Sequence, residues 1–127
     1  MMLNDNLLIG NINKELERLE NLAEIIGSAV VNRNGLLISS RLPRDIDDRK
    51  LGALAATMYE GIETATSNLK NNQIKSITVE YQDYQLIIVG VNDKIILVSL
   101  SELNVNLGLI LIEIEESINN IKNIIKK

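Results

Sequence analysis

Hydrophobic residues recur at intervals of three or four in three stretches of the chain, which is the spacing of one face of an α-helix. The first stretch predicts a helix from about Asp5 to Ala23. The second helix follows Asp47 or Asp48 and closes at Asn71-Asn72. The third begins near Asn106 and continues to the C-terminus. The apolar faces are Leu8, Ile12, Leu16 and Leu19; then Leu51, Leu54, Ala55, Met58, Ile62, Ala65 and Leu69; then Leu107, Leu111, Ile114, Ile118, Ile121 and Ile125.

Five other stretches predict β-strands. Residues 25–31 and 36–40 are β-rich and flank Asn34-Gly35, whose residue types suit a hairpin turn with positive φ. Residues 75–81 alternate, as a half-exposed edge strand does. Residues 86–91 and 95–100 are almost continuously apolar, which is typical of strands covered on both faces. Two-residue turns are expected at Gln82-Asp83 and Asn92-Asp93.

The predicted order is α-β-β-α-β-β-β-α, which indicates an α+β protein. A five-stranded antiparallel sheet with helices on both faces buries every apolar face and leaves no long connection. With 127 residues, the chain is long enough for one core, so residues 1–127 are expected to form a single domain.

Composition excludes several functions. The chain has no Cys and no His, so it lacks a thiolate nucleophile, a Cys-based zinc site and the usual general base. A net charge of −4 argues against nucleic acid, which needs a basic surface. The longest apolar run, Leu109 to Ile112, is far too short to span a bilayer, and no secretory signal is visible. We therefore expect a cytoplasmic protein that is not an enzyme, holds no cofactor or metal, and does not insert into membranes.

Two charged groups offer alternatives to that expectation. Asp45, Asp47 and Asp48 are spaced closely enough to hold magnesium, but carboxylates before a helix are more typical of caps. Arg33, Arg41 and Arg44 lie near predicted loops; one alternative is an arginine finger on a phosphate, although solvated loop arginines are commoner.

The second helix carries a further stripe of small residues. Ala53, Thr57, Gly61, Thr64 and Asn68 recur at helical spacing, about 100° around the helix from Leu54, Met58 and Ile62. If the large apolar face lies on the sheet, the small stripe points sideways. Gly61 costs helix stability, for which close approach of another helix would compensate. The stripe predicts a helix–helix interface, and the alternative is a plain surface.

The chain resembles the roadblock/LC7 domain family. The resemblance rests on the order of elements, the strand Gly27 to Val31 before an Asn-Gly turn, and an Asn-Leu-Gly hinge, Asn106 to Gly108, between the last strand and the last helix. It implies a homodimer in which the second helix and the third strand form the interface and the sheet continues across a two-fold axis. It also implies a two-helix platform that binds small Ras-like GTPases without conventional catalytic residues.

We therefore expect a homodimeric regulator or scaffold of a small Ras-like GTPase. One alternative is an assembly adaptor that bridges other proteins without a GTPase, and a weaker one is a small-ligand sensor or enzyme on a profilin-like sheet. The expected dimer-interface residues are Ala53, Thr57, Gly61, Thr64, Ser76, Thr78 and Glu80. The expected partner surface consists of Arg41, Arg44, Glu60, Ser67 and Asn68.

Overall fold

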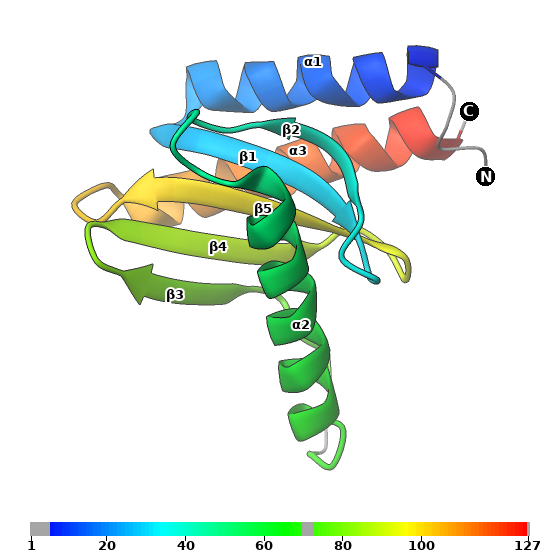
Figure 1. Ribbon diagram of the computed structural model, residues 1–127, viewed down its shortest axis with the longest axis vertical. Helices are drawn as coiled ribbons and strands as arrows, with labels where there is room; N and C mark the ends of the chain where they lie inside the picture. The colour runs from blue at the N-terminus through cyan, green and yellow to red at the C-terminus, as the bar shows by residue number, and fades with distance from the viewer. Residues whose placement is uncertain (1–5, 70–72, 127) are drawn as a thin grey trace.

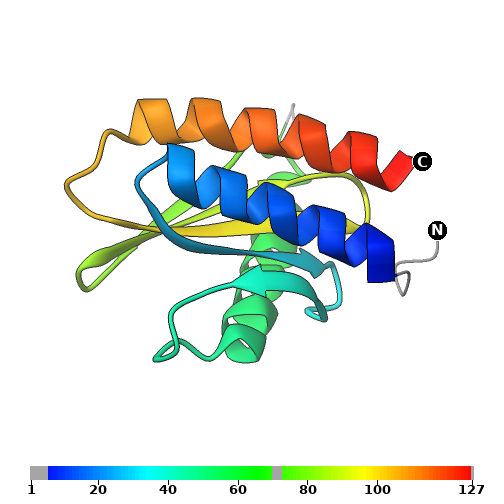
Figure 2. The same cartoon turned by 90° about the horizontal axis from the view of Figure 1, so that it is seen from above.

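The computed structural model describes residues 6–69 and 73–126. In chain order its elements are α1 (Asn6–Leu22), β1 (Ile25–Asn32), β2 (Leu37–Arg41), α2 (Asp48–Thr66), β3 (Ile77–Tyr81), β4 (Tyr84–Gly90), β5 (Ile95–Glu102) and α3 (Leu107–Lys126). The strands form one antiparallel sheet in the order β2-β1-β5-β4-β3. α1 and α3 cover one face and α2 crosses the other (Figures 1 and 2). The predicted α+β fold class and the order of elements are confirmed.

Two apolar cores lie on either side of the sheet. The core under α1 and α3 contains Ile12, Leu16 and Ile114 with Val30, and the core under α2 contains the alternate residues of the same strands, such as Val31. All but one of the residues of β5 are buried. The almost continuous apolar run of this central strand is therefore explained by helices on both of its faces.

The turns follow their residue types, with one exception. Gln82-Asp83 forms the predicted two-residue turn, with Gln82 at φ 53°. The link between β4 and β5 was predicted to turn at Asn92-Asp93 alone, and this is wrong. The N–H of Val91 and the N–H of Asn92 both donate to the Ile95 carbonyl, at 2.9 and 3.2 Å. The loop therefore takes in Lys94, whose N–H donates to the Asn92 side chain.

Short polar side chains cap two helices. The Asp47 carboxylate accepts from the N–H of Lys50 at 3.1 Å, and the Asn106 side-chain oxygen accepts from the N–H of Leu109 at 3.2 Å. Each satisfies a backbone donor that the first turn leaves without a partner. The capping role predicted for Asp47 is thus confirmed, and Asn106 caps α3, whereas the predicted helix end at Asn71-Asn72 lies outside the described residues.

A buried carboxylate joins α1 to α3. Glu15 is only 9% exposed, and its Oε2 accepts from Arg18 at 2.7 Å, from the Ser117 hydroxyl at 2.8 Å and from the Asn120 amide at 3.2 Å. Burial by itself raises the pKa of a carboxyl group, but the bonds from Arg18, Ser117 and Asn120 outweigh it and hold the pKa of Glu15 below its usual value. Glu15 is therefore a charged contact between the two helices.

Substitution of Gly27 is expected to lower the stability of the protein. A Cβ added there would lie 2.5 Å from the backbone oxygen of Arg41, so Gly27→Ala requires β1 and β2 to move apart. We expect the free energy of unfolding to fall by about 2 kcal/mol, measured by urea denaturation. Gly10→Ala is the matched control, because a Cβ at Gly10 meets nothing within 4 Å. This control should raise the stability of α1 by up to about 1 kcal/mol, and equal effects of the two changes would contradict the close contact.

Among the described residues, no helix is both long enough and apolar enough to cross a bilayer.

Candidate interaction surface

The first half of α2 packs on the sheet through small residues. Its buried positions are Gly52, Ala55, Ala56 and Tyr59. A Cβ on Gly52 would lie only 3.3 Å from a methyl group of Val31, so the helix backbone runs close to β1. Absence of large side chains at this contact is what allows the close approach.

The turn between β1 and β2 also lies against this half of the helix. Gly35 has a φ of 88°, which favours glycine, and a Cβ there would lie 3.2 Å from the Cα of Ala53. The Asn32 side-chain oxygen accepts from the N–H groups of Asn34 and Leu36 and holds the turn in shape. The Asn-Gly pair thus brings the first hairpin against α2.

Only part of the large apolar stripe of α2 lies on the sheet, so that prediction is partly wrong. Ala55 is buried, and Leu51 and Met58 pack against the core under α2. Leu54, Ile62 and Leu69 are 52%, 42% and 62% exposed. At 100° per residue, the stripe that contains them is centred about 110° around the helix from the buried Gly52–Tyr59 face. Small residues of α2 face the sheet because the helix backbone approaches it closely. The large side chains of Leu54, Ile62 and Leu69 point sideways.

The stripe of small residues is correspondingly displaced. Ala53, Thr57, Gly61 and Thr64 are all exposed, and a Cβ on Gly61 would meet nothing within 4 Å. This stripe is centred about 145° from the buried face, so it points away from the sheet rather than along it. The predicted sideways direction of the small stripe is therefore wrong.

The middle of α2 is held by contacts with β4 and with the turn after β1. The Tyr59 hydroxyl lies over Gly90, where a Cβ would come within 2.5 Å of it. The guanidinium of Arg33 stacks on the Tyr59 ring, 4.4 Å from its centroid, and its Nη1 donates to Glu63 at 2.8 Å. Burial raises the pKa of Tyr59, so its hydroxyl stays protonated. Arg33 is therefore engaged within the chain, which argues against its use as an arginine finger.

The second half of α2 extends past the edge of the sheet (Figure 1). That edge is β3, as predicted from its alternating pattern. Ile77 and Val79 pair with buried residues of β4 whose side chains face α2, and both are half-buried. Tyr81, on the same face, is 65% exposed. Ser76, just before the strand, and Thr78 and Glu80 are exposed and belong to the opposite alternation.

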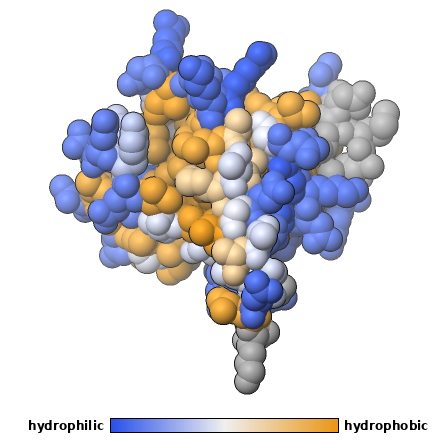
Figure 3. All heavy atoms as spheres, turned by 60° about the horizontal axis from the view of Figure 1, so that its bottom comes forward, coloured by the Kyte–Doolittle hydropathy of each residue, from blue (hydrophilic) through white to orange (hydrophobic). Residues whose placement is uncertain are grey.

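The apolar side chains of the helix and of the edge strand form one exposed surface. In Figure 3, which brings the lower end of Figure 1 forward, apolar side chains gather in the middle of the molecule beside a paler strip. We name this area the α2/β3 surface; it consists of Leu54, Met58, Ile62 and Ala65 on α2, Leu69 just after α2, and Ile77, Val79 and Tyr81 on β3. An exposed apolar area of this kind is typical of a protein–protein contact.

The residues predicted for partner binding do not lie together. Arg44 is exposed in the loop between β2 and α2, Glu60 is exposed on α2, and Ser67 and Asn68 are exposed just after α2 ends. Arg41 instead reaches α1, where its guanidinium forms an ion pair with Glu20 at 3.2 Å. Because Arg41 lies on the opposite face of the sheet, the structure does not bring it to the others.

The predicted magnesium residues have separate partners. Asp47 caps α2, and Asp48 accepts from the Ser40 hydroxyl at 3.0 Å. Within residues 6–69 and 73–126, no group of three or more acidic, His or Cys side chains has the arrangement of a metal site. These aspartates therefore shape the start of α2.

Sequence reasoning missed the small-residue contact that seats α2. Gly52, Ala55 and Ala56 followed by Tyr59 recur at helical spacing, so a second face was visible in the sequence. No comparable signal distinguished Glu15 from Glu17 or Glu20 on the same helix.

Comparisons with known proteins agree with this architecture. The Roadblock/LC7 domain model matches residues 12–101. An uncharacterized protein of Methanocaldococcus jannaschii is 30% identical over 111 residues, which cover 87% of this chain and 93% of that protein.

Two solved structures are similar throughout. Myxococcus xanthus MglB has a TM-score of 0.87 at 24% identity, covering 93% of this chain and 90% of that one. The gliding protein MglB of Thermus thermophilus has a TM-score of 0.84 at 12% identity, covering 92% and 90%. At these identities the likeness establishes the shared fold.

Proposed function

This chain belongs to the Roadblock/LC7 domain family, and on that premise we propose that it is a non-catalytic homodimeric regulator or scaffold of a small Ras-like GTPase. The observation that carries the proposal is the α2/β3 surface, where large apolar side chains are exposed beside an edge strand. A second copy of the chain would cover both features at once. We also propose that residues 1–127 act as one domain and that the protein is cytoplasmic.

The proposed dimer joins the two β3 strands. An edge strand presents backbone N–H and C=O groups without partners, and antiparallel pairing with the same strand of a second copy satisfies them. Ser76, Thr78 and Glu80 would then flank the paired backbones on the face of α3. Because α2 extends past this edge, its second half would lie over the partner's sheet. Its apolar stripe would thereby contact Ile77, Val79 and Tyr81 of the other copy.

In this arrangement the stripe of small residues lies outside the dimer interface, whereas the sequence predicted that it forms that interface. Ala53, Thr57, Gly61 and Thr64 point away from the sheet, so we place them on the outer side of the paired helices. Glu60 on α2, and Ser67 and Asn68 just after it, are also exposed. Together they form the proposed platform, and its small side chains permit close approach of a partner.

The proposed regulation acts through the switch segments of the GTPase itself. The chain has no His and no Cys. It would act by favouring one arrangement of the GTPase switch segments, which the γ-phosphate orders. The family supports this partner class, and the platform supports a protein partner rather than a small substrate.

Calorimetry tests the proposal directly. A small Ras-like GTPase from the same organism is titrated into the protein, loaded first with GDP and then with a non-hydrolysable GTP analogue. We expect at least a tenfold difference in Kd between the two states, equivalent to about 1.4 kcal/mol. The reason is that the switch segments differ between the states while the platform does not.

Variants separate the possible outcomes. Arg44→Ala is expected to weaken binding because Arg44 lies exposed beside the start of α2, whereas Lys14→Ala removes the same charge from α1 on the other face and should not. Equal Kd values for both nucleotide states would support a scaffold and would exclude recognition of the switch segments. Absence of binding to every such GTPase would favour the assembly adaptor. Intact binding by Arg44→Ala with lost stimulation of hydrolysis would make Arg44 an arginine finger.

A further inference from the structure

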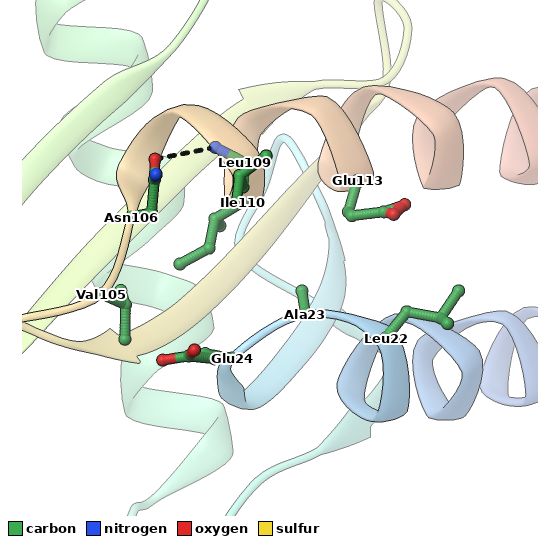
Figure 4. Close-up of a pocket in the computed structure, with 8 residues that line it drawn as sticks. All are labelled: Leu22, Ala23, Glu24, Val105, Asn106, Leu109, Ile110 and Glu113. Carbon is green, nitrogen blue, oxygen red and sulfur yellow. Dashed lines mark hydrogen bonds between the residues drawn. The ribbon is translucent and has the colours of Figure 1, made fainter.

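A small cavity lies where α1 ends and α3 begins, on the face of the sheet opposite α2 (Figure 4). Its volume is about 120 Å³. The buried side chain of Ile110 lines it, together with Ala23 and Val105, which pack against the core beneath α1 and α3. The Asn106 cap holds the first turn of α3 in place beside it. The cavity therefore has an apolar wall built from three segments of the chain.

Large apolar side chains surround this cavity without being buried. Leu22 is 60% exposed and Leu109 is 62% exposed, and both line the cavity. Ile112, one turn after Leu109, is also 62% exposed. Such a cluster gains from contact with an apolar partner group, because water is removed from both surfaces.

Both charged groups that line the cavity are acidic. Glu24 follows α1, Glu113 projects from the second turn of α3, and Figure 4 shows them on either side of the apolar wall. Among the described residues, no Lys or Arg lies within ion-pair distance of either carboxylate. Arg18 on the neighbouring helix is bound to Glu15 at 2.7 Å. The cavity thus combines an apolar wall with two carboxylates that form no ion pair among the described residues; Arg18 interacts with Glu113 only at longer range.

We propose that this cavity binds a leucine-sized side chain of a basic peptide segment in a partner protein. The volume suits one branched aliphatic side chain, since a cavity of about 150 Å³ accommodates benzene. Glu24 and Glu113 would pair with lysine or arginine on either side of that side chain. An anionic lipid surface is disfavoured because the same carboxylates repel it. Since α2 lies on the opposite face, this site and the α2/β3 surface can be occupied together.

Nuclear magnetic resonance titration of the full chain tests the proposal. The probes are three capped five-residue peptides: one with a leucine between two lysines, one with an alanine in place of the leucine, and one with glutamates in place of the lysines. We expect the leucine–lysine peptide to have a Kd at least about fivefold lower than either of the others, because only it supplies both the apolar side chain and the cations. The shifted amide signals should centre on Ala23, Leu109 and Ile110.

A charge-matched pair of variants completes the test. The double variant Glu24→Gln, Glu113→Gln should raise the Kd of the leucine–lysine peptide at least about fivefold. The control Glu17→Gln, Glu116→Gln removes the same charge from exposed positions that do not line the cavity and should leave the Kd unchanged. Equal Kd values for the leucine and alanine peptides, equal effects of the two double variants, or shifts confined to the α2/β3 surface would each overturn the proposal. So would the absence of shifts at millimolar peptide.

Discussion

Replacing Ile62 with glutamate is expected to separate the proposed dimer, raising its Kd by about 100-fold, or about 2.8 kcal/mol. Ile62 lies in the middle of the exposed apolar stripe of α2 and in the half of the helix that extends past β3. Association would bury it, so a carboxylate there loses its hydration without gaining a partner. The two-fold arrangement doubles the effect, because each copy carries the charge. The protomer should stay folded, because Ile62 is 42% exposed within it.

Thr64→Glu is the matched control, and it also decides between two versions of the interface. Thr64 lies on the same half of α2 and receives the same charge, but it points away from the sheet. Sedimentation equilibrium over a range of concentrations gives the Kd of each variant, and far-ultraviolet circular dichroism checks the fold. If Thr64→Glu separates the dimer and Ile62→Glu does not, the small stripe is the interface, as first predicted. A wild-type chain that is monomeric at tens of micromolar contradicts both versions.

Glu15→Gln is expected to lower the free energy of unfolding by about 2–3 kcal/mol at neutral pH. The change keeps the shape of the side chain but removes the charge to which Arg18 donates twice, at 2.7 and 2.9 Å, and leaves that guanidinium poorly paired. Urea denaturation at one fixed protein concentration measures the difference, since association also contributes to stability. Glu17→Gln is the control. Glu17 is exposed and lies 3.9 Å from Arg41, so we expect a change within about 0.5 kcal/mol.

The effect of Glu15→Gln on the free energy of unfolding is expected to depend on pH. The pKa of Glu15 is lower in the folded protein than its usual value of 4.5, so the folded state favours the ionised form. Its contribution is therefore complete above pH 4.5 and is lost as the pH falls through the folded pKa. The difference in unfolding free energy between the wild type and Glu15→Gln should accordingly be largest near neutral pH and shrink below pH 4.5. A difference that stays constant into acid would assign it to packing rather than to charge.

The sequence predicted the elements well because their periodicities were strong and unambiguous. Ile12, Leu16 and Leu19 allow one buried face for α1, and the almost continuous apolar run from Ile95 to Leu100 indicates a strand covered on both sides. The alternating residues of β3 correctly placed that strand at an edge. Local patterns suffice where one arrangement buries all the apolar residues.

The orientation of α2 was not predictable in the same way, because this helix has two apolar faces. The face of Leu54 and Ile62 has the larger hydrophobic side chains, so hydrophobicity favours it as the face that packs on the sheet. The sheet selects Gly52 and Tyr59 instead, since small residues near Val31 let the backbone approach and Tyr59 fits over Gly90. Shape decided the contact, and hydrophobicity alone carries no information about shape.

Contacts between distant parts of the chain were likewise not predictable from the sequence. Glu15 and Ser117 are 102 positions apart, and Arg41 finds Glu20 only once β2 lies beside α1. Nothing local distinguishes such residues from solvated ones, so Glu15 was overlooked and Arg41 was placed on the partner surface. Electrostatic partners follow from topology and must be read from the structure.

The extension of α2 past the sheet links helix formation to association. Tyr59 and Glu63 mark the last points at which the helix is held by its own protomer, and most of the described positions from Thr64 to Leu69 are exposed. A helix end without tertiary support opens readily, so its amide hydrogens exchange fast with solvent in an isolated chain. Covering by a second copy would slow that exchange. The ordering of this last segment and the assembly of the protein would then be a single equilibrium, governed by the amount of protein present.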